Sequence, residues 1–427
     1  MAPPVSPDEF AALMAPLGPF EPSPRLAAAV SGGADSLALA LLSAAWVRAR
    51  NGTLLALVVD HALRPESAAE AAQTIGRLTA MGIPARLLRL TGLTSGPAIA
   101  ERARIARYAA LAAACADAAT LHLLLGHHAA DQAETVLMRR QGGSGPAGLA
   151  AMPAISEQAA LRLLRPLLSI PPARLRATLC ASGIGWVEDP SNRDPRALRS
   201  RLRSSLNDPD GDGAETATLC RAARAAALAR AEHEADIAAV LARRAAIRPE
   251  GFAVLSPGPI DPAALAALIQ AVAGAIYPPP TQAVAGLAAA PRPATLAGVR
   301  MLPAGRLGDG LLLVREAAAV APPVPAEPQA TWDGRFRLSS RAVPPPGATI
   351  GALGPDSARL RRHSPLPAAA LWTLPALRLG NYLAAVPHLL YPDCETCAAV
   401  PLVFSPRRSA AGPPFAPWGD AESGNMW

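Results

Sequence analysis

The sequence contains no lysine, so all 40 of its basic residues are arginine. A phosphate-binding loop of the Walker type needs a lysine of its own, and Schiff-base enzymes need a lysine amine. The sequence therefore excludes both classes. Against 33 acidic residues the arginines leave a net charge of +7 and an isoelectric point of about 9.8, which suits a polyanionic partner such as nucleic acid.

Cysteine and long apolar runs are also scarce. The five cysteines are scattered, and an odd, scattered set does not make a disulfide framework. No basic segment precedes an apolar run near the first residue, and no stretch of about 20 apolar residues escapes interruption by charge or glycine. We therefore expect a cytoplasmic protein that does not associate with membranes.

Short apolar runs alternate with longer helical stretches between residues 26 and 145. The pattern predicts strands over 26–30, 53–60, 85–90 and 121–125, and helices over 34–50, 66–81, 98–118 and 127–140. This alternation predicts an α/β fold with a parallel, doubly wound sheet and helices on both faces. Ligands bind such sheets at the carboxyl ends of the strands.

Two linkers divide the rest of the chain, an acidic one at 207–213 and a proline-rich one at 322–328. They predict a catalytic domain over 20–207, a helical second domain over 214–320 and a small β-leaning module over 330–405. We expect residues 406–427 to form a disordered tail.

The turn between the first predicted strand and helix reads Ser31-Gly32-Gly33-Ala34-Asp35-Ser36. Glycine lets backbone amides approach a phosphate, and the helix behind them adds unpaired N–H groups and a positive dipole end. The two serine hydroxyls can donate hydrogen bonds. An aspartate fits such an anion site when it holds Mg²⁺. The turn therefore predicts an ATP-binding loop.

This string resembles the Ser-Gly-Gly-x-Asp-Ser signature of the PP-loop ATP pyrophosphatases, which cleave ATP between its α and β phosphates and transfer AMP to an oxygen. Further motifs resemble those of the tRNA(Ile)-lysidine synthetase family and follow in its order. They are Asp60-His61-Ala62-Leu63-Arg64, residues 101–108, residues 126–135, Gly143-Ser144-Gly145, Arg165-Pro166-Leu167-Leu168 and residues 188–192. The match is dense over about 25–205 and looser beyond.

The resemblance implies a ligase that uses ATP and Mg²⁺. ATP adenylates the C2 oxygen of the wobble cytidine in the isoleucine tRNA with a CAU anticodon, and free lysine then displaces AMP. The rear domains would bind the tRNA, and relatives form monomers or homodimers. The matched motifs assign His61 to ATP and make candidates for substrate or phosphate contact of Arg64, Glu101, Arg104, His127 and Arg165.

Acidic residues of the 127–140 helix complete the predicted site. His127, Asp131 and Glu134 recur at helical spacing, so they share one face beside the phosphate loop. We expect Asp131 to hold Mg²⁺ together with Asp35, and Glu134 to bind the lysine ammonium and accept its proton. The roles of Asp131 and Glu134 could be exchanged. An arginine ladder further on would face the tRNA backbone: Arg196, Arg199, Arg201 and Arg203.

Two other functions stay open from the sequence. A PP-loop tRNA thiolation enzyme of the 2-thiocytidine type needs reactive cysteines near the site, and the one close pair, Cys394 and Cys397, lies far along the chain from the motifs. The other is an RNA-binding PP-loop protein without activity, against which the intact Asp35, Asp131 and Glu134 argue.

Overall fold

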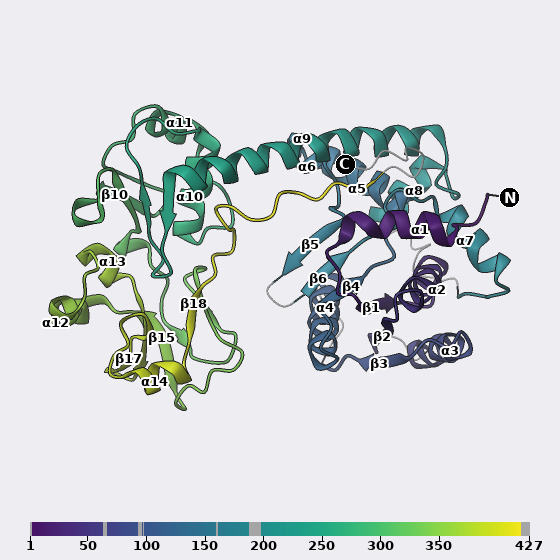
Figure 1. Cartoon of the computed structure of the whole chain (residues 1–427), viewed down its shortest axis with the longest axis horizontal. Coiled ribbons are helices and arrows are strands. Elements are labelled where there is room, and N and C mark those ends of the chain that lie inside the picture. The colour runs from purple at the N-terminus through teal and green to yellow at the C-terminus, as the bar shows by residue number, and fades with distance from the viewer. Residues whose placement is uncertain are drawn as a thin grey trace. The chain divides into compact units, whose positions relative to one another are not determined.

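The computed structural model describes residues 2–62, 66–92, 96, 98–158, 161–187 and 198–419, without the side chains of 198–200 and 363. The chain forms two compact units, one of Met1–Glu232 with Pro414–Trp427 and one of His233–Pro413 (Figure 1). The second unit is therefore an insertion in the first, which differs from the boundaries at 207–213 and 322–328 that the linkers suggested. None of the helices in the described ranges has both the length and the apolar composition that a membrane span requires.

The first unit is built on one six-stranded sheet. Its strands are β1 (Arg25–Val30), β2 (Thr53–Asp60), β3 (Ala85–Arg89), β4 (His122–Leu124), β5 (Ile155–Gln158) and β6 (Leu161–Leu164). They lie in the order β3-β2-β1-β4-β6-β5, and all neighbours are parallel except β5 and β6. Ala28 of β1 lies opposite Ala56 of β2 and Leu124 of β4. The predicted parallel sheet is confirmed.

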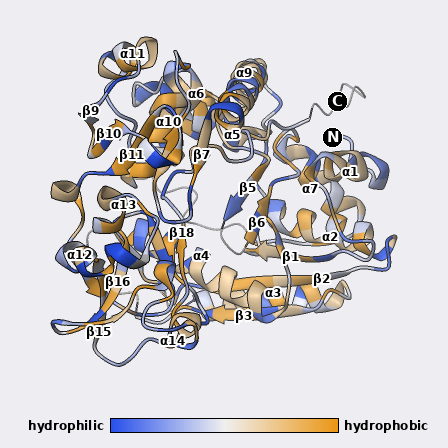
Figure 2. Ribbon diagram, turned by 60° about the vertical axis from the view of Figure 1, so that its left-hand side comes forward, coloured by the Kyte–Doolittle hydropathy of each residue, from blue (hydrophilic) through white to orange (hydrophobic). Residues whose placement is uncertain are grey.

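Helices pack on both faces of this sheet, with α2 (Ala34–Arg48) on one face and α4 (Ile99–Asp117) on the other. The other helices up to residue 244 are α1 (Pro7–Met14), α3 (Ser67–Ala80), α5 (Ala129–Gln141), α6 (Pro146–Leu149), α7 (Pro172–Ala181), α8 (Leu198–Leu206) and α9 (Ala214–Arg244), the last of which continues into the second unit. Alternate residues of β1 point to opposite faces of the sheet. Leu26, Ala28 and Val30 join the core that contains α2, whereas Ala27 and Ala29 join the core that contains α4. Figure 2 colours β1 and β2 as hydrophobic, as expected for strands buried on both sides.

The strand order reverses beside β1, and this reversal places the site. The chain moves outward from β1 to β2 and β3, then crosses to β4 on the other side of β1. At such a switch point the loops after the two central strands diverge and leave a crevice at their carboxyl ends. Here these loops lead into α2 and α5. Helix α5 begins at Ala129 and not at His127 as predicted, because His128 is extended and occupies the N-cap position.

The second unit contains more β-structure than the sequence indicated. Strands β7 (Ala245–Ile247), β8 (Ala253–Leu255), β9 (Ala294–Leu296), β10 (Val299–Pro303) and β11 (Leu311–Arg315) form an antiparallel sheet in the order β7-β8-β11-β10-β9. Helices α10 (Pro262–Ala273) and α11 (Thr281–Ala289) share its hydrophobic core. The helical domain expected over 214–320 is therefore mixed. Strands of three to five residues are too short to show a clear alternation.

The predicted β-leaning module consists of two small sheets with short helices. One sheet has the order β12-β15-β16-β17 and the other β13-β14-β18. Their strands are β12 (Val324–Pro325), β13 (Thr331–Trp332), β14 (Phe336–Leu338), β15 (Ala348–Ala352), β16 (Pro375–Leu379), β17 (Tyr382–Ala385) and β18 (Leu402–Phe404). The helices are α12 (Ser357–Leu360), α13 (Ala368–Trp372) and α14 (Cys394–Ala399).

The disordered tail expected over 406–427 needs correction. Phe415 and Trp418 are buried in the main core of the first unit, and Ala416 accepts a backbone hydrogen bond there. Residues 420–427 lie outside the described part of the chain.

A buried ion pair holds the second unit together. The side chains of Arg335 and Asp333 are 0% and 1% exposed, and Arg335 Nε donates to Asp333 Oδ2 at 2.7 Å. Asp333 also accepts from Arg315 and from the backbone N–H of Ala321. Burial lowers the pKa of Arg335 to about 10 despite the Asp333 charge, which leaves the guanidinium protonated at neutral pH.

Removing the negative partner should therefore destabilise the second unit. Asp333→Asn leaves a buried guanidinium without its counter-charge, which costs about 3 kcal/mol of unfolding free energy. Chemical denaturation followed by fluorescence of the six tryptophans measures this loss. The exposed Asp309→Asn is the matched control, and equal stability of the two variants would contradict the prediction.

Candidate active site

The turn after β1 is shaped by glycine and closed by a serine hydroxyl. Gly32 has a φ of +90°, and a Cβ at this position would collide with Thr74 Oγ1 of α3. Ser36 Oγ accepts from the Ser31 N–H at 3.1 Å and donates to the Gly33 carbonyl at 3.0 Å. The Ser36 hydroxyl, expected to face phosphate, thus fixes the shape of the loop.

The helix behind this loop presents its N-terminus to the crevice. Gly33 is the N-cap residue of α2 and makes no side-chain capping hydrogen bond. The first N–H groups of a helix need acceptors, and a phosphate at this end is favoured by the helix dipole. The loop and the first turn of α2 therefore present the backbone N–H groups that the predicted ATP-binding loop requires.

The chain after β4 packs directly against this loop. A Cβ at Gly126 would lie 3.2 Å from Ser36 Cα and 3.3 Å from the Asp35 carbonyl carbon and oxygen. These neighbours are backbone atoms that cannot rotate away, so only glycine allows the approach. As a result, the residues that follow Gly126 lie beside Asp35.

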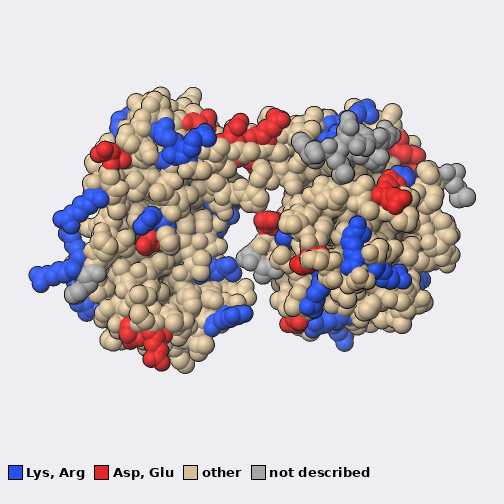
Figure 3. Space-filling model, viewed as in Figure 1, with Lys and Arg blue, Asp and Glu red and all other residues tan. Residues whose placement is uncertain are grey.

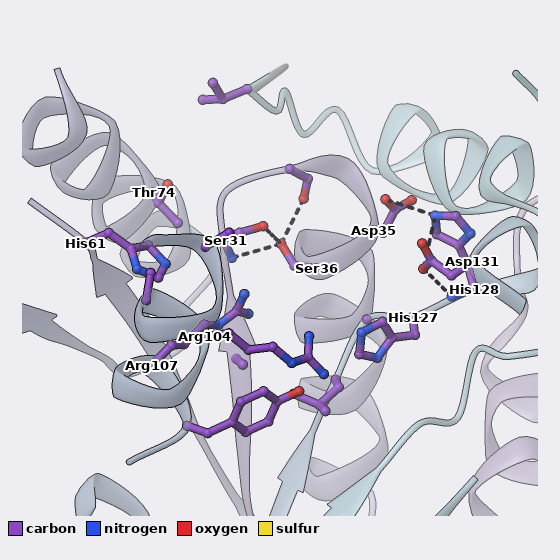
Figure 4. Close-up of a pocket in the computed structure, with 18 of the residues that line it drawn as sticks. Ser31, Asp35, Ser36, His61, Thr74, Arg104, Arg107, His127, His128 and Asp131 are labelled. Carbon is purple, nitrogen blue, oxygen red and sulfur yellow. Dashed lines mark hydrogen bonds and ion pairs between the residues drawn. The ribbon is translucent and has the colours of Figure 1, made fainter. Parts of the chain in front are cut away.

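Two predicted metal ligands meet at His128. The His128 Nε2 atom is 3.4 Å from Asp35 Oδ2 and 3.6 Å from Asp131 Oδ2, and the backbone N–H of His128 donates to Asp131 at 3.0 Å (Figure 4). Burial disfavours the charged ring, but the charges of Asp131 and Asp35 outweigh it and raise the pKa of His128 to about 9. The imidazole is therefore protonated at neutral pH. The two carboxylates together favour a positive charge at the position of the His128 ring.

The same two acids fit a magnesium ion. In the described residues no cluster of three or more His, Cys, Asp and Glu side chains forms a metal site by itself. Mg²⁺ does not need one, because it commonly takes one or two carboxylates and fills its other positions with water and phosphate oxygens. Asp35 and Asp131 supply such a pair next to the anion-binding loop.

A cavity of about 880 Å³ opens at this point, large enough for a nucleotide. Helix α4 lines it with Glu101, Arg104 and Arg107, and the residue after β2 lines it with His61. Burial, followed by the Arg107 charge, lowers the pKa of His61, so its ring is neutral. Other lining residues come from the phosphate loop, α3, the β4–α5 turn and α8: Ser31, Gly33, Asp35, Ser36, Glu70, Thr74, His127, His128, Asp131 and Arg203.

The sequence of this chain is similar to those of known proteins. Residues 6–209 match the PP-loop domain family. The chain is 36% identical over 383 residues to the tRNA(Ile)-lysidine synthase of Ruegeria pomeroyi, covering 86% of this chain and 89% of that protein.

The chain belongs to the tRNA(Ile)-lysidine synthase family.

Two further members of the family match over shorter stretches. The synthase of Methylobacterium sp. (strain 4-46) is 41% identical over 275 residues, which cover 63% of this chain and 77% of that protein. The synthase of Bradyrhizobium sp. (strain BTAi1) is 46% identical over 233 residues, which cover 54% of this chain and 64% of that protein. The matched part of the chain thus spans less than two thirds of the Bradyrhizobium relative.

Glu134 lies elsewhere than the sequence suggested. Its side chain is 1% exposed, it does not line the cavity, and its Oε1 atom accepts from Arg203 Nε at 2.7 Å. Arg203 itself lines the cavity, and its side chain is 42% exposed. Glu134 thus fixes the position of Arg203 through its Oε1 atom.

Arg165 is also placed differently. It is buried directly behind the cavity lining, where it interacts with the lining residue Tyr108. Its Nη1 atom donates to the Pro153 carbonyl at 2.9 Å and lies 3.0 Å from the Ser156 hydroxyl. It thus ties β6 to the segment before β5. Arg201 is exposed. Arg64, Arg196 and the motif at 188–192 lie outside the described residues, as does the side chain of Arg199.

Sequence reasoning missed His128, although it stands inside a matched motif. The predicted site listed His127 and the acids of this helix but gave His128 no role. The observed N-cap conformation of His128, with φ −132° and ψ −177°, brings its ring back to the carboxylates. The sequence signal that could have found it is the spacing of an N-cap residue and an acid three positions later.

The packing at Gly126 makes a direct prediction. Gly126→Ala inserts a methyl group between backbone atoms, and such overpacking costs about 1–3 kcal/mol. The phosphate loop must shift away from α5, so we expect ATP affinity to fall by about tenfold, measured by calorimetry.

Gly76→Ala in α3 is the matched control, because a Cβ there has nothing within 4 Å. Unchanged ATP affinity in Gly126→Ala would show that the close approach at Gly126 does not position the phosphate loop for ATP binding.

Proposed function

We propose that this chain is an ATP-dependent ligase that attaches lysine to C2 of the wobble cytidine in the isoleucine tRNA with a CAU anticodon. The observation that carries the proposal is the convergence of Asp35 and Asp131 beside an anion-binding loop, in a member of the tRNA(Ile)-lysidine synthase family. The reaction passes through an adenylated cytidine and releases pyrophosphate and AMP.

The phosphate loop and α4 hold and orient ATP. Backbone N–H groups at the start of α2 bind phosphate oxygens, and Arg104 and Arg107 of α4 line the opposite part of the cavity as positive charges. This arrangement offsets the charge that develops when the cytidine oxygen attacks the α-phosphate and pyrophosphate leaves. The neutral His61 ring can accept or donate a hydrogen bond toward the nucleoside.

Asp35 and Asp131 would hold Mg²⁺. When bound there, the ion neutralises phosphate charge next to the reacting oxygen. Asp131 also lines the cavity, whereas Glu134 acts through Arg203. We therefore assign to Asp131 the direct contact with the lysine amine. This amine must lose a proton before it becomes a nucleophile.

The geometry does not favour tRNA thiolation. All five cysteines are described, and none of them lines the cavity. Burial raises the pKa of Cys115 and of Cys220 to about 11, which keeps both as thiols. Cys394 and Cys397 both belong to α14 of the second unit.

The partner would be tRNA in the cytoplasm, bound in part by arginines of the second unit. Arg359, Arg361 and Arg362 are exposed in and after α12, and Figure 3 shows basic side chains along the surface of this unit. Arginine clusters of this kind bind phosphate backbones and release counterions. The exposed Arg201 of α8 is a candidate contact in the first unit.

Labelled lysine tests the function directly. After incubation with ATP and isotopically labelled lysine, the isoleucine tRNA should gain the mass of lysine less water, at the wobble cytidine alone. A gain of sulfur in a parallel incubation that also contains a sulfide donor would favour thiolation instead. No gain in mass with any tRNA would support an RNA-binding protein without activity.

The two acids should be needed for adenylation and not for tRNA binding. We expect Asp35→Asn and Asp131→Asn each to reduce tRNA- and lysine-dependent pyrophosphate release by at least about a hundredfold, because charge stabilisation at the reacting phosphate is lost. Asp117→Asn is the control, since the Asp117 side chain is 62% exposed at the end of α4. Near-normal release in either active-site variant would refute the assignment.

Binding of tRNA should weaken steeply with salt. Each arginine–phosphate contact contributes about 0.9 to the slope of log affinity against log salt concentration. We therefore expect Arg361→Ala to lower the slope by about one unit and Arg86→Ala, on the edge strand β3, to leave it unchanged. A flat salt response of the wild-type protein would exclude an arginine-based tRNA surface.

A further inference from the structure

The end of the described chain forms a packed strap, residues 414–419, on the first unit. Within this short segment Phe415 and Trp418 are only 7% and 6% exposed and belong to the same core as β1 and α2. The carbonyl of Ala416 accepts the backbone N–H of Ala154 at 2.8 Å. In a chain with 4% aromatic residues, two buried rings this close together mark a structural element.

Helix α9 holds the strap from one side. Arg224 Nε donates to the carbonyl of Trp418 at 3.2 Å, and the Arg230 guanidinium lies 4.5 Å from the centre of the Phe415 ring. Arg230 also donates to the Ala147 carbonyl of α6 at 3.1 Å. The strap is thereby fastened to α9 and to the segment that runs from α6 to β5.

That segment is in turn fastened to the catalytic helix α5. The fully buried Gln132 donates to the Met152 carbonyl and accepts the Met152 N–H, both at 2.9 Å. Arg139 donates to the carbonyls of Ala151 and Gly148. Gln132 directly follows Asp131, so a displacement of this segment would be transmitted to the carboxylate that lines the cavity.

We propose that the strap is a positioning element for α5 and hence for Asp131. A hydrogen bond joins the strap to Ala154, the backbone continues from Ala154 to Met152, and two hydrogen bonds join Met152 to Gln132. Because the strap follows the inserted second unit in the chain, the catalytic unit is complete only when the chain has returned from that insertion. The effect on activity rests on the proposed function, whereas the structural effect does not.

Full-length point variants test the link. We expect Phe415→Ala and Trp418→Ala to speed hydrogen exchange of the backbone amides of residues 146–154 and to reduce kcat by roughly tenfold, since small displacements of a catalytic group are costly. The KM for tRNA should change less than about twofold, because the arginines proposed to bind tRNA are not part of the strap. The exposed Pro414→Ala is the matched control and should leave both readouts unchanged.

A second version keeps the native strap and cuts the chain after folding. A specific protease site is inserted between Gly412 and Pro413, both exposed, and the cut protein is passed over a sizing column. The strap peptide should stay bound with kcat retained. In the cut Phe415→Ala variant the peptide should be lost, and added wild-type peptide should restore kcat and exchange protection.

The outcomes separate the two proposals. Loss of the peptide from the cut wild-type protein with kcat and amide exchange unchanged would overturn the strap proposal. Unchanged exchange in both aromatic variants would also overturn it. If exchange responds as expected but no lysine is ever attached to tRNA, the proposed function fails and the strap proposal stands.

Discussion

The site depends on the close approach between the β4–α5 turn and the first turn of α2. At Gly126 the two backbones are separated by less than the space of one methyl group. Main-chain contact therefore sets the position of α5 relative to the phosphate loop, with no flexible side chain between the two segments at Gly126. This contact brings Asp131 to the same histidine nitrogen as Asp35, although the two acids belong to the first turns of different helices, α5 and α2.

Two carboxylates at one place repel each other unless a positive charge lies between them. In this structure the protonated ring of His128 supplies that charge. A divalent cation would offset the repulsion between the two carboxylates in the same way when the phosphates of ATP bind at the N-terminus of α2. Around this centre, a buried Glu134 holds Arg203 toward the cavity, and α4 adds two more arginines. The cavity thus holds negative and positive groups close together. Such groups can stabilise the charges that develop when a bond to phosphorus breaks.

Much of the front half could be predicted from the sequence. Strands β1 to β4 followed from apolar runs, whereas β5 and β6 were not predicted as strands. The loop at Ser31–Ser36 and the proximity of Asp35 and Asp131 followed from motif and topology. What could not be predicted depends on tertiary packing. The N-cap turn at His128 sets its ring direction, and Glu134 is buried against an arginine from a distant helix. Arg165 binds the Pro153 carbonyl and the Ser156 hydroxyl. The short strands of the second unit and the buried strap leave almost no periodic signal.

The central claim is that the cavity activates the cytidine oxygen by adenylation so that lysine can replace it. A heavy-oxygen label placed at C2 of the wobble cytidine tests this most directly. We predict that the label leaves the tRNA and appears in the phosphate of the released AMP, in equal amount to the lysine attached. Lysine attached while the label stays in the tRNA, or AMP released without it, would contradict the proposed chemistry.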